Sequence, residues 1–243
     1  MKLKVINTGS VGNCYLLENE NEVLMIECGV NIKEIKKALN FSFSKVVGAI
    51  VSHEHLDHYR SAKDLMKLGV NVYATEGTFG GFSSNRAKTI KAHAPFPIGE
   101  FKVMPFDIRH DAKEPVCFLI NHPQCGNVLF LSDSFYCPYT FNNLNNIIVE
   151  ANFSKEIIDR KMREGASPEF LRNRILKSHL SLENCKELLR ANDLSQVNNI
   201  VLIHLSDSHS NEQQFQSEIQ NLTGKNVTVA SAGMEIGFTK TPF

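Results

Sequence analysis

At 243 residues the chain is long enough for one large domain or two small ones, and 42% hydrophobic residues suffice for a substantial core. Its 26 basic and 26 acidic side chains give a formal net charge of zero, which excludes a global basic field that would attract nucleic acid. No apolar run approaches the roughly 20 residues needed to span a membrane, and the first four residues lead into an expected strand without an export signal.

The six cysteines show neither a C-x-x-C spacing nor a compact disulfide framework. Such cysteines are typical of reduced, mostly buried thiols in a reducing compartment. Together with the missing export signal, they predict a cytoplasmic protein with no membrane partner.

Short strands and helices alternate in the first half of the chain. Asn31 is the expected N-cap of a helix that runs to about Leu39. Further helices are expected over residues 61–68 and 75–82, and the polar residues 83–100, with two prolines and a glycine, are expected to form a surface loop. Apolar and β-branched runs predict strands over residues 3–6, 14–17, 23–26, 46–51, 70–74 and 101–106.

In the second half, helices are expected over residues 154–191, with breaks at 165–168 and around 178–181. Ser210 and Gln213 form an expected capping box for a helix to about Leu222. Further strands are expected over residues 116–120, 128–131, 147–149, 200–203, 227–230 and 235–238. This alternation, with hairpins at both ends and no linker, predicts one α/β domain over residues 1–243, a helix-covered β-sandwich in an αββα arrangement.

A cluster of metal-ligand side chains directly follows the expected strand 46–51. His53, His55, Asp57 and His58 fall within six residues. The first two histidines are spaced i and i+2, which suits an extended or turning backbone rather than a helix. Imidazole and carboxylate together suit zinc or a similar first-row metal, so the cluster predicts a metal site.

This histidine-x-histidine-x-aspartate-histidine pattern after a strand resembles the signature of the metallo-β-lactamase fold superfamily. The sequence is most similar to its YycJ/WalJ-type branch, phosphodiesterases and nucleases related to RNase Z. Residues 9–14, Gly-Ser-Val-Gly-Asn-Cys, resemble the opening of that branch. We interpret them as a hairpin turn; the alternative is a backbone nest that holds a phosphate at the mouth of the site. The resemblance implies a metallo-β-lactamase-like αββα sandwich.

Three more candidate ligands each follow an expected strand, at a rim where distant segments can converge. Taken singly, a His or Asp after a strand is usually a cap or turn residue, but the superfamily places its later ligands in the order found here. The resemblance therefore implies two divalent ions, Zn or Mn, roughly 3.5–4 Å apart. Their ligands would be His53, His55 and His110 for one ion, Asp57, His58 and His204 for the other, and Asp133 bridging both.

Two further segments resemble the RNase Z and YycJ branches. Residues 148–152 carry Glu150 at a strand end, and residues 178–181 carry His179 just before a helix that Ser181 is expected to cap. A leaving alkoxide needs a proton from a general acid, and an imidazole held by a carboxylate suits that task. We therefore predict catalytic roles for His179, Glu150 and Asp57, with a capping or packing role for His179 as the alternative.

The resemblance implies a DNA exonuclease that uses a hydroxide activated by two metal ions. A small-molecule phosphodiesterase acting on cyclic or dinucleotide phosphates, an RNase Z-like ribonuclease and a regulatory module without turnover remain alternatives, and the full ligand set argues against the last. Local basic clusters predict substrate contacts by Arg172 and Lys91, although solvated helix faces explain such charges equally well. The partner is nucleic acid, DNA favoured over RNA, or a small phosphodiester, and a homodimer is left open.

Overall fold

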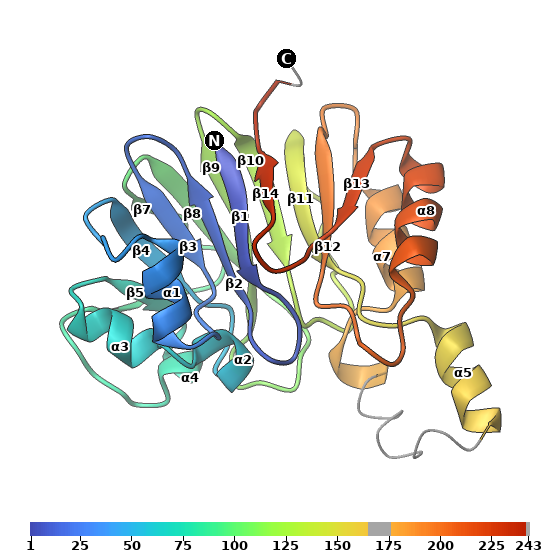
Figure 1. Ribbon diagram of the computed structural model, residues 1–243, viewed down its shortest axis with the longest axis horizontal. Helices are drawn as coiled ribbons and strands as arrows, with labels where there is room; N and C mark the ends of the chain where they lie inside the picture. The colour runs from blue at the N-terminus through green and yellow to red at the C-terminus, as the bar shows by residue number, and fades with distance from the viewer. Residues whose placement is uncertain (165–175, 242–243) are drawn as a thin grey trace.

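The computed structural model describes residues 1–164 and 176–241, in which two seven-stranded β-sheets pack face to face (Figure 1). Helices cover the outer face of each sheet. The predicted αββα sandwich is thereby confirmed.

The first sheet is built mainly from the N-terminal part of the chain. Its strands lie in the order β14-β1-β2-β3-β4-β5-β6. They are β1 (Lys2–Asn7), β2 (Cys14–Glu18), β3 (Val23–Ile26), β4 (Val46–Ile50), β5 (Val72–Ala74), β6 (Ala87–Thr89) and β14 (Glu235–Gly237). The helices between these strands are α1 (Ile32–Ala38), α2 (Leu56–Tyr59), α3 (Ala62–Lys67) and α4 (Glu76–Phe79).

The second sheet has the order β13-β12-β11-β10-β9-β8-β7. Its strands are β7 (Phe96–Ile98), β8 (Phe101–Asp107), β9 (Val116–His122), β10 (Gly126–Leu131), β11 (Leu144–Glu150), β12 (Asn199–Ile203) and β13 (Asn226–Val229). Its helices are α5 (Lys155–Arg163), α7 (Leu182–Ala191) and α8 (Glu212–Thr223). The neighbours β10, β11, β12 and β13 are mutually parallel, so their C-terminal ends meet at one edge.

The period-2 alternation of strand side chains divides the core into layers, as β10 illustrates. Val128 and Phe130 point into the layer between the two sheets. Leu129 and Leu131 point to the opposite face and pack in the layer that includes residues of α7 and α8. A strand that is apolar on both faces is therefore buried on both sides, which fixes the position of the residue that follows it.

Three local expectations are corrected. Residues 83–100 are not a continuous loop, because β6 and β7 add short edge strands to the two sheets. The N-cap of α8 is Asn211, whose side chain accepts from the backbone N–H of Gln214, whereas the Ser210 hydroxyl donates to the carbonyl of Ser206. The metal-ligand cluster contains the short helix α2, which the spacing of its histidines did not indicate.

Among the described helices, none is long and apolar enough to cross a membrane.

Candidate metal centre and active site

The predicted ligand residues lie at the rim where the strands of both sheets end. His53 and His55 follow β4, and His110 follows β8. Asp133 and His204 follow the parallel strands β10 and β12, whose ends lie at the same edge. Strand topology alone therefore brings together residues up to 151 positions apart in the chain (His53 to His204).

Asp57 and His58 reach the same place from α2. The helix begins after His55, its N-cap, so the chain turns sharply between the first two histidines and the Asp57–His58 pair. Gly29 packs against this turn: a Cβ at Gly29 would lie 1.7 Å from the carbonyl oxygen of Asp57. The close approach requires glycine and fixes α2 against the end of β3.

Asp133 is the hub of the cluster. Its Oδ2 lies 2.9 Å from Nε2 of His58, 3.5 Å from Nε2 of His53 and 3.8 Å from Nε2 of His110. Its Oδ1 lies 3.1 Å from Nδ1 of His204. The two oxygens of one carboxylate thus face histidines from both sheets.

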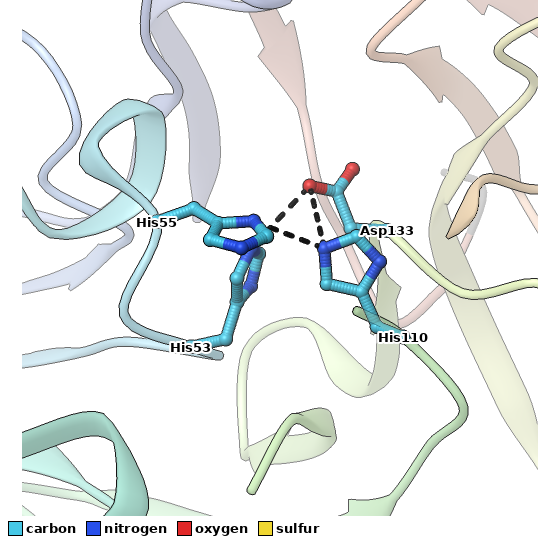
Figure 2. A group of neighbouring side chains, drawn as sticks. All are labelled: His53, His55, His110 and Asp133. Carbon is cyan, nitrogen blue, oxygen red and sulfur yellow. Dashed lines mark hydrogen bonds and ion pairs between the residues drawn. The ribbon is translucent and has the colours of Figure 1, made fainter. Parts of the chain in front are cut away.

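Figure 2 shows one half of this arrangement, with His53 and His55 approaching from one loop and His110 and Asp133 from the other side. Nδ1 of His55 and Nε2 of His110 are 3.1 Å apart. Two ligands of a tetrahedral zinc with bonds of about 2.0–2.1 Å lie only slightly farther apart than that, at ~3.3 Å. These four residues can therefore surround one ion.

The other half consists of Asp57, His58, His204 and again Asp133. Oδ2 of Asp57 lies 3.4 Å from Nε2 of His58 and 3.4 Å from Nε2 of His204. In each group, one ligand atom per residue lies within 4.8 Å of all the others. The structure brings all seven predicted ligand residues together, in two groups that share Asp133.

Unpaired ring nitrogens test whether this cluster suits a cation. Nε2 of His53 and Nε2 of His204 are buried and have no hydrogen-bond partner among the described residues. Orphaned buried polar atoms are rare because each one lacks the interaction it had with water. Nε2 of His53 faces Asp133 and Nε2 of His204 faces Asp57. A divalent cation bound by each nitrogen and its carboxylate would give the nitrogen the partner that it lacks. Imidazole and carboxylate ligands together fit zinc or manganese.

The second ring nitrogen of these histidines is held by neighbours that the sequence did not identify. Nδ1–H of His110 donates to the carbonyl of Ser178 at 2.7 Å, and Nδ1 of His53 lies 2.9 Å from the Ser52 hydroxyl. Nδ1 of His58 faces the buried carboxylate of Glu27 at 3.5 Å. Such partners orient a ring and select its tautomer. Glu27 follows β3, so the pattern of an acid directly after a strand could have found it.

Glu150 and His179 lie beside the same cluster. Oε1 of Glu150 accepts from Nδ1 of His179 at 2.8 Å and from Nδ1 of His204 at 2.9 Å. Its Oε2 accepts from the backbone N–H of Leu180 at 2.9 Å, and Ser181 caps α7 as predicted. Glu150 is fully buried, whereas the His179 side chain is 22% exposed. The His179 ring therefore faces the solvent side of the site while its carboxylate partner lies below.

Buried carboxylates raise the pKa of two histidines in the cluster. Burial alone would lower the pKa of His204, but Asp133 and Glu150 outweigh it and raise the pKa to about 9. The same balance, with Glu150 as the nearest charge, raises the pKa of His179 to about 10. His53, in contrast, has its pKa lowered by burial and by neighbouring His58.

The backbone is strained at two of the ligands. Asp133 has φ of 50° and His204 has φ of 55°, both in the left-handed region that L-residues seldom adopt. Each such conformation costs about 1–3 kcal/mol and persists only where the surroundings impose it. Both residues end a strand, so the reversal turns the side chain back over the rim, toward the cluster.

The cluster lines a cavity of about 400 Å³, which we call the site pocket. Asp57, His179 and His204 reach its surface, together with Ser10 of the glycine-bearing turn after β1. The predicted substrate contact Lys91 is exposed after β6 and does not line the site pocket. Arg172 lies outside the described residues, so both contacts stay predictions.

The remaining histidines match no motif, and the sequence suggests that they are solvated loop residues. His93 does lie at the surface, where it pairs with Asp107 at 2.7 Å. His122 is a correction, because it is fully buried at the end of β9, where it contacts Glu22 at 3.1 Å and accepts from the backbone N–H of Gln124. His209 is also buried, next to Ser206 and Ser208.

Comparison with known proteins agrees with this geometry. The family model described as "Metallo-beta-lactamase superfamily" matches residues 7–116, which include the first five predicted ligands. A solved structure, the metallo-β-lactamase fold protein YhfI from Bacillus subtilis, superposes with a TM-score of 0.71 at 16% identity, covering 97% of this chain and 99% of that one. That likeness extends the shared fold across the second sheet.

Two curated relatives are similar over most of the chain. Exodeoxyribonuclease WalJ of Streptococcus pneumoniae (strain D39) is 26% identical over 228 residues, covering 86% of this chain and 83% of that protein. Exodeoxyribonuclease YycJ of Bacillus anthracis is 25% identical over 250 residues, covering 96% and 93%. Residues 7–116 therefore match the metallo-β-lactamase superfamily, and the chain as a whole has the metallo-β-lactamase fold.

Proposed function

We propose that the protein is a phosphodiesterase that hydrolyses DNA as an exonuclease with two divalent metal ions, Zn or Mn. The observation that carries the proposal is the convergence of six His and Asp side chains on Asp133, with buried ring nitrogens unpaired among the described residues. The names of the two curated relatives support DNA as the substrate.

One ion would be held by His53, His55 and His110, and the other by Asp57, His58 and His204. Asp133 would bridge them, because its carboxylate lies beside His53 and His110 of the first group and beside His58 and His204 of the second. Bound divalent ions would supply a water of lowered pKa and neutralise the charge of the phosphate. Every other step falls to side chains of the protein.

Asp57 is suited to position the attacking water. Its side chain is 23% exposed, faces the site pocket and keeps its negative charge, because His204 and His58 outweigh burial and depress the pKa of its carboxyl. A carboxylate at this place accepts a hydrogen bond from a water molecule and directs the lone pair of that water at phosphorus. The catalytic role is therefore orientation in addition to metal binding.

His179 is suited to protonate the leaving oxygen. Its Nδ1–H is held by Glu150 and its side chain lines the site pocket, so Nε2 is the ring nitrogen left to protonate a bound substrate. A general acid must lie within hydrogen-bond reach of the departing oxygen, and a carboxylate partner stabilises its charged form. Glu150 acts as the positioning residue, because one oxygen orients both His179 and the ligand His204.

A substrate panel tests this proposal against its rivals. Purified protein loaded with Zn or Mn would be given 5′-labelled single-stranded DNA, duplex DNA, RNA and cyclic nucleotides. Progressive release of mononucleotides from DNA is expected. Turnover of cyclic nucleotides alone would establish the small-molecule alternative, which the modest size of the site pocket favours, and turnover of RNA alone would establish the ribonuclease alternative.

We further propose a cytoplasmic location and a single domain. All six cysteines are buried and free, which suits a reducing compartment. The return of β14 to pair with β1 supports one domain, because that strand pair ties the last part of the chain to the first sheet. Size-exclusion chromatography with light scattering would test for the homodimer that the sequence leaves open.

A further inference from the structure

A second cavity adjoins the site pocket, and we call it the side groove. It has a volume of about 740 Å³ and shares His110, Asp111 and Ser178 with the site pocket. The hydrogen bond between His110 and the Ser178 carbonyl therefore forms part of the wall of both cavities. A volume of this size lies within the roughly 300–1,000 Å³ of small-ligand pockets.

The side groove combines an apolar surface with positive charge. Ile108, Pro115 and Phe135 supply apolar walls. Arg109, Lys113 and Lys177 line it as well, all three side chains are exposed, and within residues 1–164 and 176–241 none of them forms an ion pair. Asp111 is the one acidic residue in its lining as described. Apolar surface ringed by unpaired cations is complementary to an aromatic base that carries a phosphate.

Phe135 is exposed although hydrogen bonds hold its backbone. The residue is 41% exposed, and both its backbone N–H and its carbonyl have partners. Its N–H donates to the carbonyl of Arg109 at 2.9 Å, and its carbonyl accepts from the Asn184 side chain at 2.9 Å. Ser134, the preceding residue, donates its N–H toward Glu150. The backbone that carries the ring is therefore held close in the chain to a residue that contacts Glu150.

We propose that the side groove is a nucleotide subsite for a single-stranded DNA end, in which a base stacks on Phe135 and its phosphate contacts Arg109 and Lys113. This proposal rests on the proposed nuclease function. A base inside a duplex has both faces stacked on its neighbours, whereas a base of an unpaired end can offer a free face to the ring. The scissile phosphate of the same strand would then lie in the adjoining site pocket.

The sequence supplies a spectroscopic test, because the chain contains no tryptophan. Phe135→Trp would place the only indole in the side groove, and Phe41→Trp is the matched control. Phe41 is 73% exposed and precedes β4, at the end of the sheet opposite the metal cluster. Metal-loaded variants would be titrated with a phosphorothioate-linked hexathymidylate, which resists cleavage. Quenching is expected for Phe135→Trp and not for Phe41→Trp; equal responses, or none, would overturn the subsite.

A second experiment, which measures activity, tests the subsite separately from the nuclease function. Phe135→Leu keeps apolar bulk but removes the ring, and it should lower kcat/KM for single-stranded DNA about tenfold more than for bis-p-nitrophenyl phosphate. Phe41→Leu should leave both activities at the wild-type level. Equal loss on both substrates contradicts the subsite while the nuclease function stands, whereas a wild-type protein inert toward DNA contradicts the nuclease function itself. Quenching by an acidic peptide as strong as that by DNA would also overturn a nucleotide subsite.

Discussion

The rings of His179 and His204 are stacked, with centroids 5.3 Å apart and planes inclined by 24°. The stacking follows from their shared partner, because Nδ1 of each ring donates to the same oxygen of Glu150. One buried carboxylate thus orients a predicted metal ligand and the predicted general acid together. The two roles can be separated experimentally, because His204 belongs to the second proposed metal group, whereas His179 belongs to neither of the two and is 22% exposed.

His179→Ala should slow cleavage of DNA by about 10²–10⁴-fold, because the leaving oxygen loses its proton donor. A diester with a nitrophenol leaving group scarcely needs that proton, so its hydrolysis should fall much less. The measurement is kcat on both substrates, with metal content determined on the same samples. Equal losses on the two substrates, or loss of metal, would show that His179 is not a general acid.

Glu150→Gln should impair both neighbours at once. The amide can still contact one ring, but it removes the negative charge that orients His204 and stabilises charged His179. We expect metal affinity to fall about 10–100-fold, as for other residues that orient a metal ligand, together with a lower kcat at saturating metal. Competition with a chromophoric chelator would measure the affinity. Glu183→Gln, in the first turn of α7, is the control, and normal affinity in Glu150→Gln would contradict the positioning role.

Asp133→Ala should reduce the occupancy of both proposed metal positions, because its carboxylate lies beside ligands of both groups. Metal analysis should give about two ions per chain for the wild type and fewer than one for the variant, with activity lost in parallel. Asp64→Ala, on the exposed face of α3, should match the wild type. A variant that keeps one tightly bound ion would show that Asp133 does not bridge.

Removal of metal should make stability depend on pH above neutrality. The pKa values of His204 and His179 are raised to about 9 and about 10, so their stabilisation is complete below about 6.5 and is lost as the pH rises through those values. Asp133 and Asp57 have depressed pKa values and stay ionised throughout this window. The Tm of chelated protein should therefore fall between pH 7 and pH 10 relative to that of metal-loaded protein. A constant difference between the two would contradict this linkage.

Binding of single-stranded DNA should weaken with salt, because each phosphate contact releases counterions. Arg109→Gln and Lys113→Gln should each reduce the slope of log K against log salt concentration by about 0.7. Lys91→Gln provides a direct comparison, since Lys91 was predicted from the sequence to contact substrate yet lines neither cavity. Fluorescence anisotropy of a labelled strand would measure all three, and an effect confined to Lys91→Gln would favour the sequence-based contact.

The fold could be predicted from local signals, and the seven candidate ligands lie together as expected, but for His110, Asp133 and His204 that expectation rested on the family resemblance. An apolar strand followed by His or Asp marks a rim position, and His53, His110, Asp133 and His204 all share this pattern. The short helix α2 was missed because four residues carry too little periodicity to indicate a helix.

The partners of the ligands could not be predicted in the same way. Ser52, Glu27 and the Ser178 carbonyl matter only because tertiary packing brings them beside a particular ring nitrogen. The burial of His122 could not be predicted either, because it depends on the packing of His122 against Glu22, which is 100 residues away in the sequence. Likewise, Arg109 and Lys113 of the side groove adjoin the site through the path of the chain after β8, not through a basic run in the sequence.

The place of β1 in the first sheet has a consequence for synthesis on the ribosome. One side of β1 pairs with β2, and the other pairs with β14, whose residues are made more than 200 positions later. At roughly 5–20 residues per second, that side waits ten seconds or more without its partner, and an unpaired strand edge invites pairing with other chains. Lys2 and Lys4, which pair with Glu235 in the folded protein, place positive charge on this side of β1 before β14 has been synthesised. The same two lysines can therefore protect the nascent chain from aggregation before they help to close the sheet.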